Sequence, residues 1–250
     1  MLTIENLTHI YPGGVCALDD VSLEIRPGAD HVRKFLKWSL DRYLRARGSQ
    51  ERDELPLERV ENQDYIHYWK GAPIMYRLKE TVGEDVVNRS LRRLLARYAF
   101  KSAPYASSKD FIKILREEAG LKYDLLITDL FQCITLYDLK AEHASCTRRP
   151  DGRYDVALDV EAHKFYADGK GRETAAPMKE DVFAGLFLAE PGKAGFDSSK
   201  VLYYARQPVV TGKQSLHFVV NRPPKFAGID RYNIWIDRNS DDNLVPVSVP

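Results

Sequence analysis

The stretch ITLYDLKAEHASC, residues 134–146, alternates apolar and polar side chains along its length. A second stretch, RYDVALDVEAHKFY at 153–166, does the same, and the turn-forming residues RPDG lie between the two. A period of two is typical of a strand with one buried face, because successive side chains point to opposite faces of a sheet. The two stretches therefore predict neighbouring antiparallel strands.

The same alternation continues toward the C-terminus in VLYYARQPVV (201–210), QSLHFVV (214–220) and RYNIWIDR (231–238). Turn clusters such as ADGKG and AEPGKAGFDSSK separate these stretches. Five or more short strands at this spacing predict an antiparallel β-sandwich over residues 132–250, folding as its own unit. Its expected inward-facing side chains are Leu136, Val156, Leu158, Val160, Phe218, Val220, Ile234 and Ile236.

Residues 29–131 follow a helical period instead. Apolar side chains recur three and four residues apart, as in Val32, Phe35, Leu36, Leu40, Tyr43 and Leu44. This spacing predicts a bundle-like set of packed helices. Within SSKDFIKILREEAG (107–120), either Ser107 or Ser108 is a candidate N-cap, and Gly120 is a candidate helix stop.

Residues 1–28 alternate again, in LTIENLTHIY and VSLEI, with Pro-Gly-Gly between the two stretches. This pattern predicts a short N-terminal β-hairpin. The whole chain is then expected to be an α+β protein in three parts, residues 1–28, 29–131 and 132–250. Two strands alone are marginal in water, so we expect residues 1–28 to contribute little to the fold.

Composition excludes several classes of protein. Of the 250 residues, 44% are hydrophobic and 29% are charged, and Lys plus Arg exceed Asp plus Glu by one, which predicts no general attraction to nucleic acid. No run approaches the 18 apolar residues of a membrane helix, and the start does not read as a secretory signal, so we expect a cytoplasmic protein. The three cysteines, Cys16, Cys133 and Cys146, lack C-x-x-C spacing and are expected to be reduced thiols.

Four stretches resemble the C-terminal portion of zinc aminopeptidases of the aminopeptidase-N and leukotriene-hydrolase family, closest to the branch fused to bacterial transporter permeases. The resemblance covers roughly residues 31–250, and it rests on RKFLKWSLDRYL (33–44), ENQDYIHYWKGAPIMYRL (61–78), LLARYAFKSAPYASSKDFI (94–112) and RYNIWIDRNSDDNLVPV (231–247). In that family the tyrosine of Y-x-K-G donates its phenol to the oxyanion of the tetrahedral intermediate. The matching residue here is Tyr68, followed by Trp69, Lys70 and Gly71.

The zinc site of that family has no counterpart in this sequence. Intact relatives, which cleave N-terminal residues from peptides, hold zinc with H-E-x-x-H and a downstream Glu, because histidines four apart share one helix face. No two of the six histidines here are four apart; they are His9, His31, His67, His143, His163 and His217. We therefore expect no metal ligands, no cofactor and a vestigial Tyr68.

The first 28 residues resemble the start of an ATP-binding-cassette ATPase, on the basis of YPGG, ALDDVSLEI and RPG. The resemblance implies that Tyr11 is a vestigial adenine-stacking position. A phosphate loop requires G-x-x-x-x-G-K-[ST], and the nearest stretches, PGKAG (191–195) and TGKQS (211–215), do not fit it. Nucleotide hydrolysis is therefore not expected, and the join near residues 28–31 has the character of a fusion between two genes.

Three hypotheses about function follow. The chain is a remnant of an aminopeptidase, or a non-catalytic binding or assembly module for a transporter or peptidase partner, or a nucleotide-binding subunit, which rests on residues 1–28 alone. The second hypothesis rests on a physical argument. Helices that lack their usual neighbouring lobe leave apolar side chains exposed, and exposed apolar surfaces of this kind bind partner proteins.

Overall fold

The computed structural model describes residues 2–10, 16–25, 29–49 and 51–248, with side chains from residue 34 onward. It divides into two compact units, Met1–Phe35 and Leu36–Pro250. In the first unit, β1 (Leu2–Ile10) and β2 (Cys16–Ile25) pair antiparallel, with Leu2 opposite Ile25. Strands therefore lie where the sequence predicts them. The predicted turn falls on residues outside the described ranges, so the hairpin itself stays a prediction.

The helical layer of the second unit includes α1 (Ala29–Arg47) from Leu36 onward, and Leu36, Leu40 and Tyr43 of this helix are buried. Its further α-helices are α2 (Gly71–Val82), α3 (Glu84–Tyr98), α4 (Ser108–Ala119) and α5 (Asp124–Ile127). Two π-helical turns, η2 (Tyr65–Lys70) and η4 (Thr128–Gln132), adjoin α2 and α5, and the short 3-10 turns η1 (Leu57–Arg59) and η3 (Leu121–Tyr123) complete the layer. The helical period of residues 29–131 is confirmed.

The N-cap of α4 is Ser107, one of the two predicted serines. Its side chain accepts a hydrogen bond from the Asp110 backbone N–H, and the Asp110 carboxylate accepts one from the Ser107 backbone N–H. This reciprocal pair is a capping box that occupies otherwise unpaired N–H groups of the first turn. Gly120 ends the helix with φ of 85°, a left-handed conformation that glycine adopts without strain.

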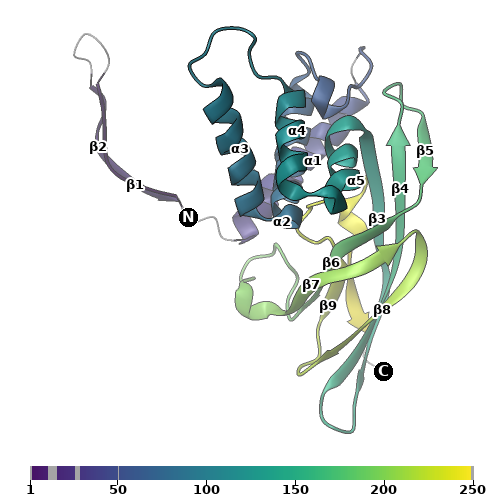
Figure 1. Cartoon of the computed structure of the whole chain (residues 1–250). Helices are drawn as coiled ribbons and strands as arrows, with labels where there is room; N and C mark the ends of the chain where they lie inside the picture. Colours follow the sequence, from purple (N-terminus) through teal and green to yellow (C-terminus); the bar gives the residue numbers. More distant parts are fainter. Residues whose placement is uncertain (1, 11–15, 26–28, 50, 249–250) are drawn as a thin grey trace. The chain divides into compact units, whose positions relative to one another are not determined.

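The eight described strands of the second unit form one curled, half-barrel sheet (Figure 1). They are β3 (Ile134–Arg148), β4 (Tyr154–Ala167), β5 (Glu173–Ala176), β6 (Lys179–Phe187), β7 (Val201–Val210), β8 (Gly212–Val220), β9 (Phe226–Ile229) and β10 (Leu244–Ser248). The order is β5-β4-β3-β10-β9-β6-β7, and β8 also pairs with β4. All pairs are antiparallel except β10 with β3. The α+β class is confirmed in this coarse sense.

The segment RYNIWIDR is not a strand, contrary to the sequence prediction. The buried Asp230 carboxylate accepts hydrogen bonds from the backbone N–H groups of Ile234 and Trp235, each at 3.0 Å. Asp230 and Asn233 have φ of 43° and 52°, so the backbone turns there instead of extending. The apolar side chains are nevertheless buried, because the segment lies beside β3: the Tyr137 backbone N–H donates to the Ile236 carbonyl, and the Arg238 backbone N–H donates to the Tyr137 carbonyl, each at 2.9 Å.

The eight predicted inward side chains are all buried, but they do not share one core. Six of them lie in the core of the sheet, together with buried residues of β3, β6 and β9. Leu136 and Ile236 instead pack in a cluster with the helical-layer residues Tyr43, Tyr65 and Ile66. The apolar residues of the strand region therefore serve two cores.

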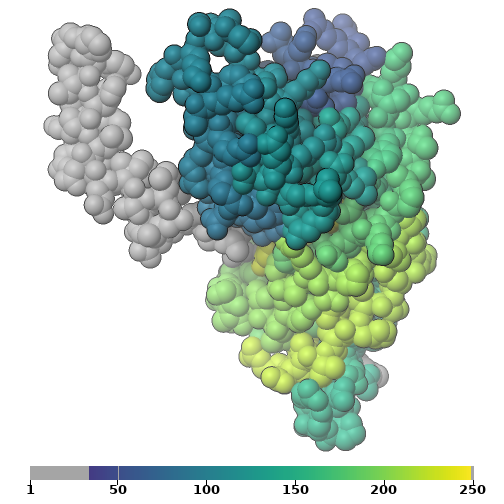
Figure 2. Space-filling view, viewed as in Figure 1, coloured from purple at the N-terminus to yellow at the C-terminus, as the bar shows by residue number. Residues whose placement is uncertain are grey.

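The helices lie against one end of the sheet (Figure 1), and in Figure 2 the helical part in blue adjoins the strands in green and yellow. This contact explains an irregularity in β3. Residues 134–137 are all buried, whereas further along the strand buried and more exposed residues alternate. Both faces of the strand are covered where the helices lie, and only one face is covered beyond them.

Candidate functional site

The Y-x-K-G segment forms the π-helical turn η2 and the first residue of α2. The side chains of Tyr68 and Lys70 point in opposite directions, because residues two apart lie on different faces of a helix. Tyr68 is 66% exposed, and Lys70 is 1% exposed. A π-helical turn inside a helical segment is frequent at functional sites. The segment therefore combines a projecting phenol with a buried ammonium group.

Lys70 is anchored by Glu54, a residue that the sequence analysis did not identify. The Lys70 Nζ donates to Glu54 Oε1 at 3.1 Å, Arg47 Nε donates to Glu54 Oε2 at 3.0 Å, and the Tyr43 hydroxyl also donates to this carboxylate. Burial lowers the pKa of Lys70, against the raising effect of Glu54. Burial would raise the pKa of Glu54, but Lys70, Tyr43 and Arg47 together lower it. The buried pair thus holds η2 in place.

Aromatic side chains of η2 and α1 lie at or near the surface. The His67 and Tyr68 rings meet edge to face with centroids 4.4 Å apart. The Arg42 guanidinium lies 4.4 Å from the ring centroid of Trp38 and 5.0 Å from that of Trp69. Trp38 is 48% exposed. We call Trp38, Arg42, Tyr68 and Trp69 the aromatic surface.

Of the two site residues predicted from the sequence, the structure describes Tyr68 alone. Tyr11, the predicted adenine-stacking residue, lies outside the described residues. Among residues whose side chains are described, no three His, Cys, Asp or Glu groups are arranged to hold a metal ion. His163 contacts Glu161 at 3.0 Å, and His67 contacts Asp64 at 3.5 Å. In these two contacts each histidine meets one carboxylate.

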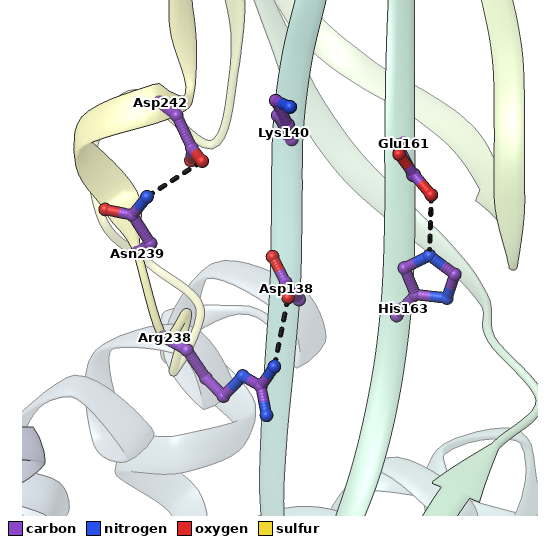
Figure 3. Close-up of a pocket in the computed structure, with 7 residues that line it drawn as sticks. All are labelled: Asp138, Lys140, Glu161, His163, Arg238, Asn239 and Asp242. Atoms are coloured by element: carbon purple, nitrogen blue, oxygen red, sulfur yellow. Dashed lines mark hydrogen bonds and ion pairs between the residues drawn. The ribbon is translucent and has the colours of Figure 1, made fainter.

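A polar hollow of about 460 Å³ lies on the sheet where β3 and β4 face the segment around η6 (Ser240–Asp242) (Figure 3). Its acidic side chains are each paired with a neighbour in the hollow. Arg238 donates to Asp138 at 3.1 Å, His163 contacts Glu161 at 3.0 Å, and Asn239 donates to Asp242 at 2.8 Å. Because these pairs already use the hollow's acidic groups, the arrangement provides neither an activated nucleophile nor a ligand set.

Sequence analysis also missed a buried group of charges between the helices and the sheet. Lys164 donates to Asp129 and lies 3.4 Å from Glu180, and the Glu180 carboxylate lies 3.6 Å from Arg77 Nη2. Tyr166 donates to Asp129 at 2.7 Å. We call these five residues the helix–sheet junction. The sequence held one signal that Lys164 is buried. Lys164 continues the inward-facing register of β4 that is set by Val156, Leu158, Val160 and Ala162.

No protein-family model matches this chain, and no curated protein matches it either. Among the described helices, none combines the length and the apolar character needed to cross a membrane.

Proposed function

We propose that this chain derives from the zinc aminopeptidase family and that it does not hydrolyse peptides by itself. In this proposal residues 29–131 correspond to the helical part of the catalytic domain, and residues 132–250 correspond to the β-domain that follows it. Residues 1–28 derive from the start of a cassette ATPase joined to them. Peptides are the substrates of intact relatives.

The observation that carries the proposal is the presentation of Tyr68. A phenol that stabilises an oxyanion must project from a rigid support, because preorganised donors act without rearrangement during the reaction. Tyr68 is 66% exposed, and two residues later Lys70 is fixed to the buried Glu54 at 3.1 Å. This combination of a fixed support and a projecting phenol is what the oxyanion role requires.

Tyr68 alone does not make a hydrolase. In the mechanism of the relatives, attack on a peptide bond also needs a Lewis acid and a base to activate water, and the helices before the stretch that matches RKFLKW supply both. In this chain the cassette-like residues occupy that place in the sequence. Tyr68 is then a vestigial oxyanion donor, and zinc is a cofactor of the relatives only.

The proposal includes the β-sandwich expected for residues 132–250. Hydrogen bonding links seven strands in one path and joins β8 to it through β4, so two separate facing sheets are not established. The curl of the sheet supports a sandwich-like core, because β7 comes opposite β8 with the Tyr203 and Phe218 ring centroids 4.9 Å apart. Side chains from the two sides of the curl then fill one interior.

Zinc content and hydrolysis of leucine 4-nitroanilide test the primary proposal. We expect the purified chain to contain no stoichiometric zinc and to release no nitroaniline. One zinc per chain, together with hydrolysis that a chelator abolishes, would overturn the proposal. In that event the Tyr68→Phe variant would lose most of the activity, since it removes the oxyanion donor.

The aromatic surface favours a second candidate, a binding module for a peptidase or transporter protein. Exposed aromatic side chains and arginine are enriched at protein interfaces. A photo-crosslinking residue placed at position 68 would capture a partner in cells under this candidate. The matched control is position 105, where Tyr105 is 78% exposed and lies outside the aromatic surface. Equal crosslinking from both positions, or none from position 68, would exclude it.

A further inference from the structure

A cavity of about 410 Å³ lies between the helical layer and the sheet. Its helical side is formed by α2, η3 and α5, and its other side is formed by the start of β6, the second half of β7 and Trp235. This volume lies in the range of pockets that take small organic ligands. We call this cavity the Arg77 pocket, after the residue at its most buried part.

Arg77 projects from α2 and is 3% exposed. Its guanidinium carbon lies 3.4 Å from the ring centroid of Trp235 and 4.9 Å from that of Tyr137. Stacking of this kind stabilises the cation and fixes the plane of its donors. The guanidinium is therefore held rigidly at the wall of the cavity.

The donors of Arg77 are not all used. Among the described residues, Nε and Nη2 are buried and donate no hydrogen bond. The Glu180 carboxylate is 3.6 Å from Nη2, which is beyond hydrogen-bond length, and the same carboxylate lies 3.4 Å from Lys164 Nζ. One carboxylate is thus shared by two cations. Buried donors without partners are costly, so a further acceptor would be bound favourably.

The remaining lining of the pocket favours an anion. Four cationic side chains and two carboxylates line it, an excess of two positive charges, although the whole chain carries a net charge of only +1. The cationic side chains are Arg77, Lys122, Lys179 and Arg206. Charges of one sign around a concave site raise the local concentration of the opposite ion.

An apolar wall adds to this charge. Tyr123, Leu125 and Leu126 also line the pocket, and Leu125 is 63% exposed. Such a wall suits a ligand with an apolar part, because burying the exposed leucine surface is favourable. A fully hydrated ion such as inorganic phosphate would leave this surface uncovered.

We propose that the Arg77 pocket binds a small organic carboxylate with a short apolar body. Its carboxylate meets the Arg77 guanidinium, whose planar donors match carboxylate geometry, and its apolar part covers Leu125 and Leu126. Lys122 and Lys179 attract the anion. This inference does not depend on the aminopeptidase lineage, since it uses no residue of the Y-x-K-G segment.

Titration of the full-length protein with N-acetyl-leucine tests the proposal, followed through the Trp235 indole N–H signal in a proton–nitrogen NMR spectrum. A Trp235→Phe variant identifies that signal. We expect saturable shifts with Kd of about 1 mM, as is usual for a ligand of this size. N-acetyl-leucinamide, which has the same apolar body and no charge, should bind at least tenfold more weakly.

Matched variants locate the binding. Arg77→Gln should abolish it, and Lys122→Glu combined with Lys179→Glu should weaken it at least tenfold. Lys193→Glu is the control, because it makes the same type of charge change in the loop after the C-terminal end of β6, away from Lys179 at the other end. This variant should bind N-acetyl-leucine as the wild type does. If Arg77→Gln does not fold, the lysine double variant decides, because both lysines are exposed.

Three results would overturn the proposal. The first is no saturable shift with N-acetyl-leucine in the wild type, and the second is equal affinity for the acid and the amide. The third is unchanged binding by the lysine double variant. Competition by inorganic phosphate at equal concentration would also contradict it, since it would show that the site reads charge alone.

Discussion

Strand β4 contributes to both the core of the sheet and the helix–sheet junction, with different side chains in each. Along β4, Val156, Leu158 and Val160 are at most 1% exposed and pack among apolar neighbours. Four residues after Val160 in the same register, Lys164 is 2% exposed and meets Asp129 and Glu180. The inward face of one strand thus changes from apolar to charged where the helices cover the sheet.

The difference teaches how the two regions depend on their neighbours. An apolar core is stabilised by removal of its surface from water, and its stability varies little with pH. A buried ion pair contributes little net stability, but losing one partner leaves an uncompensated charge. The core should therefore tolerate loss of the helices, and the junction should be sensitive to single changes of charge.

The largest expected effect comes from separating the two regions. We expect residues 130–250 alone to melt cooperatively, since the sheet core lies within them, at a lower temperature than the whole chain because Leu136 and Ile236 lose their cover. Residues 29–130 alone should aggregate or stay molten. Calorimetry and near-ultraviolet circular dichroism measure both. A cooperative transition in the helical fragment but not in the strand fragment would contradict the expectation that the sheet core folds without the helices.

Removal of Lys164 should have the next largest effect. Lys164→Ala leaves Asp129 buried beside Tyr166 without its cation, and the expected loss of stability is about 3 to 5 kcal/mol. Urea denaturation measures it. Lys140→Ala on the exposed face of β3 is the matched control and should change stability by less than about 0.5 kcal/mol. Equal effects of the two changes would show that the junction is not electrostatically coupled.

The pH dependence of stability should arise beside the junction, in the loop that carries Trp235. Burial raises the pKa of Asp237 from 3.8 to about 7, so the folded protein holds a proton there that the unfolded chain releases. This contribution is complete below pH 3.8 and is lost as the pH rises through 7.

Between pH 5 and pH 8 the expected loss of stability is about 2 to 4 kcal/mol, measured by urea denaturation at the two pH values. Burial also raises the pKa of Asp230, which acts in the same direction. Asp237→Asn should reduce the difference between the two pH values. An unchanged difference in that variant would assign the pH dependence to other groups.

The smallest effect should come from the end of α4, away from both regions. Ser107→Ala removes the side-chain acceptor for the Asp110 backbone N–H, at a cost of about 1 kcal/mol. Hydrogen bonds from Ser107 and Tyr98 also hold the pKa of Asp110 at about 2, so the variant should raise that pKa. Denaturation and NMR titration measure the two changes. Ser102→Ala, in the exposed segment before the cap, should change neither.

Much of the fold was predictable because burial leaves a periodic pattern. The strand limits near 134–146 and 153–166 were correct, and so was the choice of Ser107 as one of two caps. The stretches that form β5, β6, β9 and β10 were missed. The prediction of a strand at RYNIWIDR was wrong. The alternation of Ile234 and Ile236 indicates which side chains are buried, but it does not indicate the turn that Asp230 imposes on the backbone.

Of the candidate sites, the sequence identified Tyr68 and missed the groups that hold the segment in place. Glu54 and Lys70 are 16 residues apart, and no local pattern links them. Arg77 likewise lies in an ordinary helical sequence. Its proposed role in binding a carboxylate depends on Trp235 and Glu180, which come from distant segments. Only folding brings these groups together.

By itself the sequence determined where helices and strands lie and which faces they bury, because local periodicity follows from the geometry of each element. The tertiary structure decided that one curled sheet serves two cores, that Leu136 faces the helices, and that Lys164 is buried among carboxylates. These features depend on contacts between residues far apart in the chain, and such contacts are fixed by the packing of whole elements.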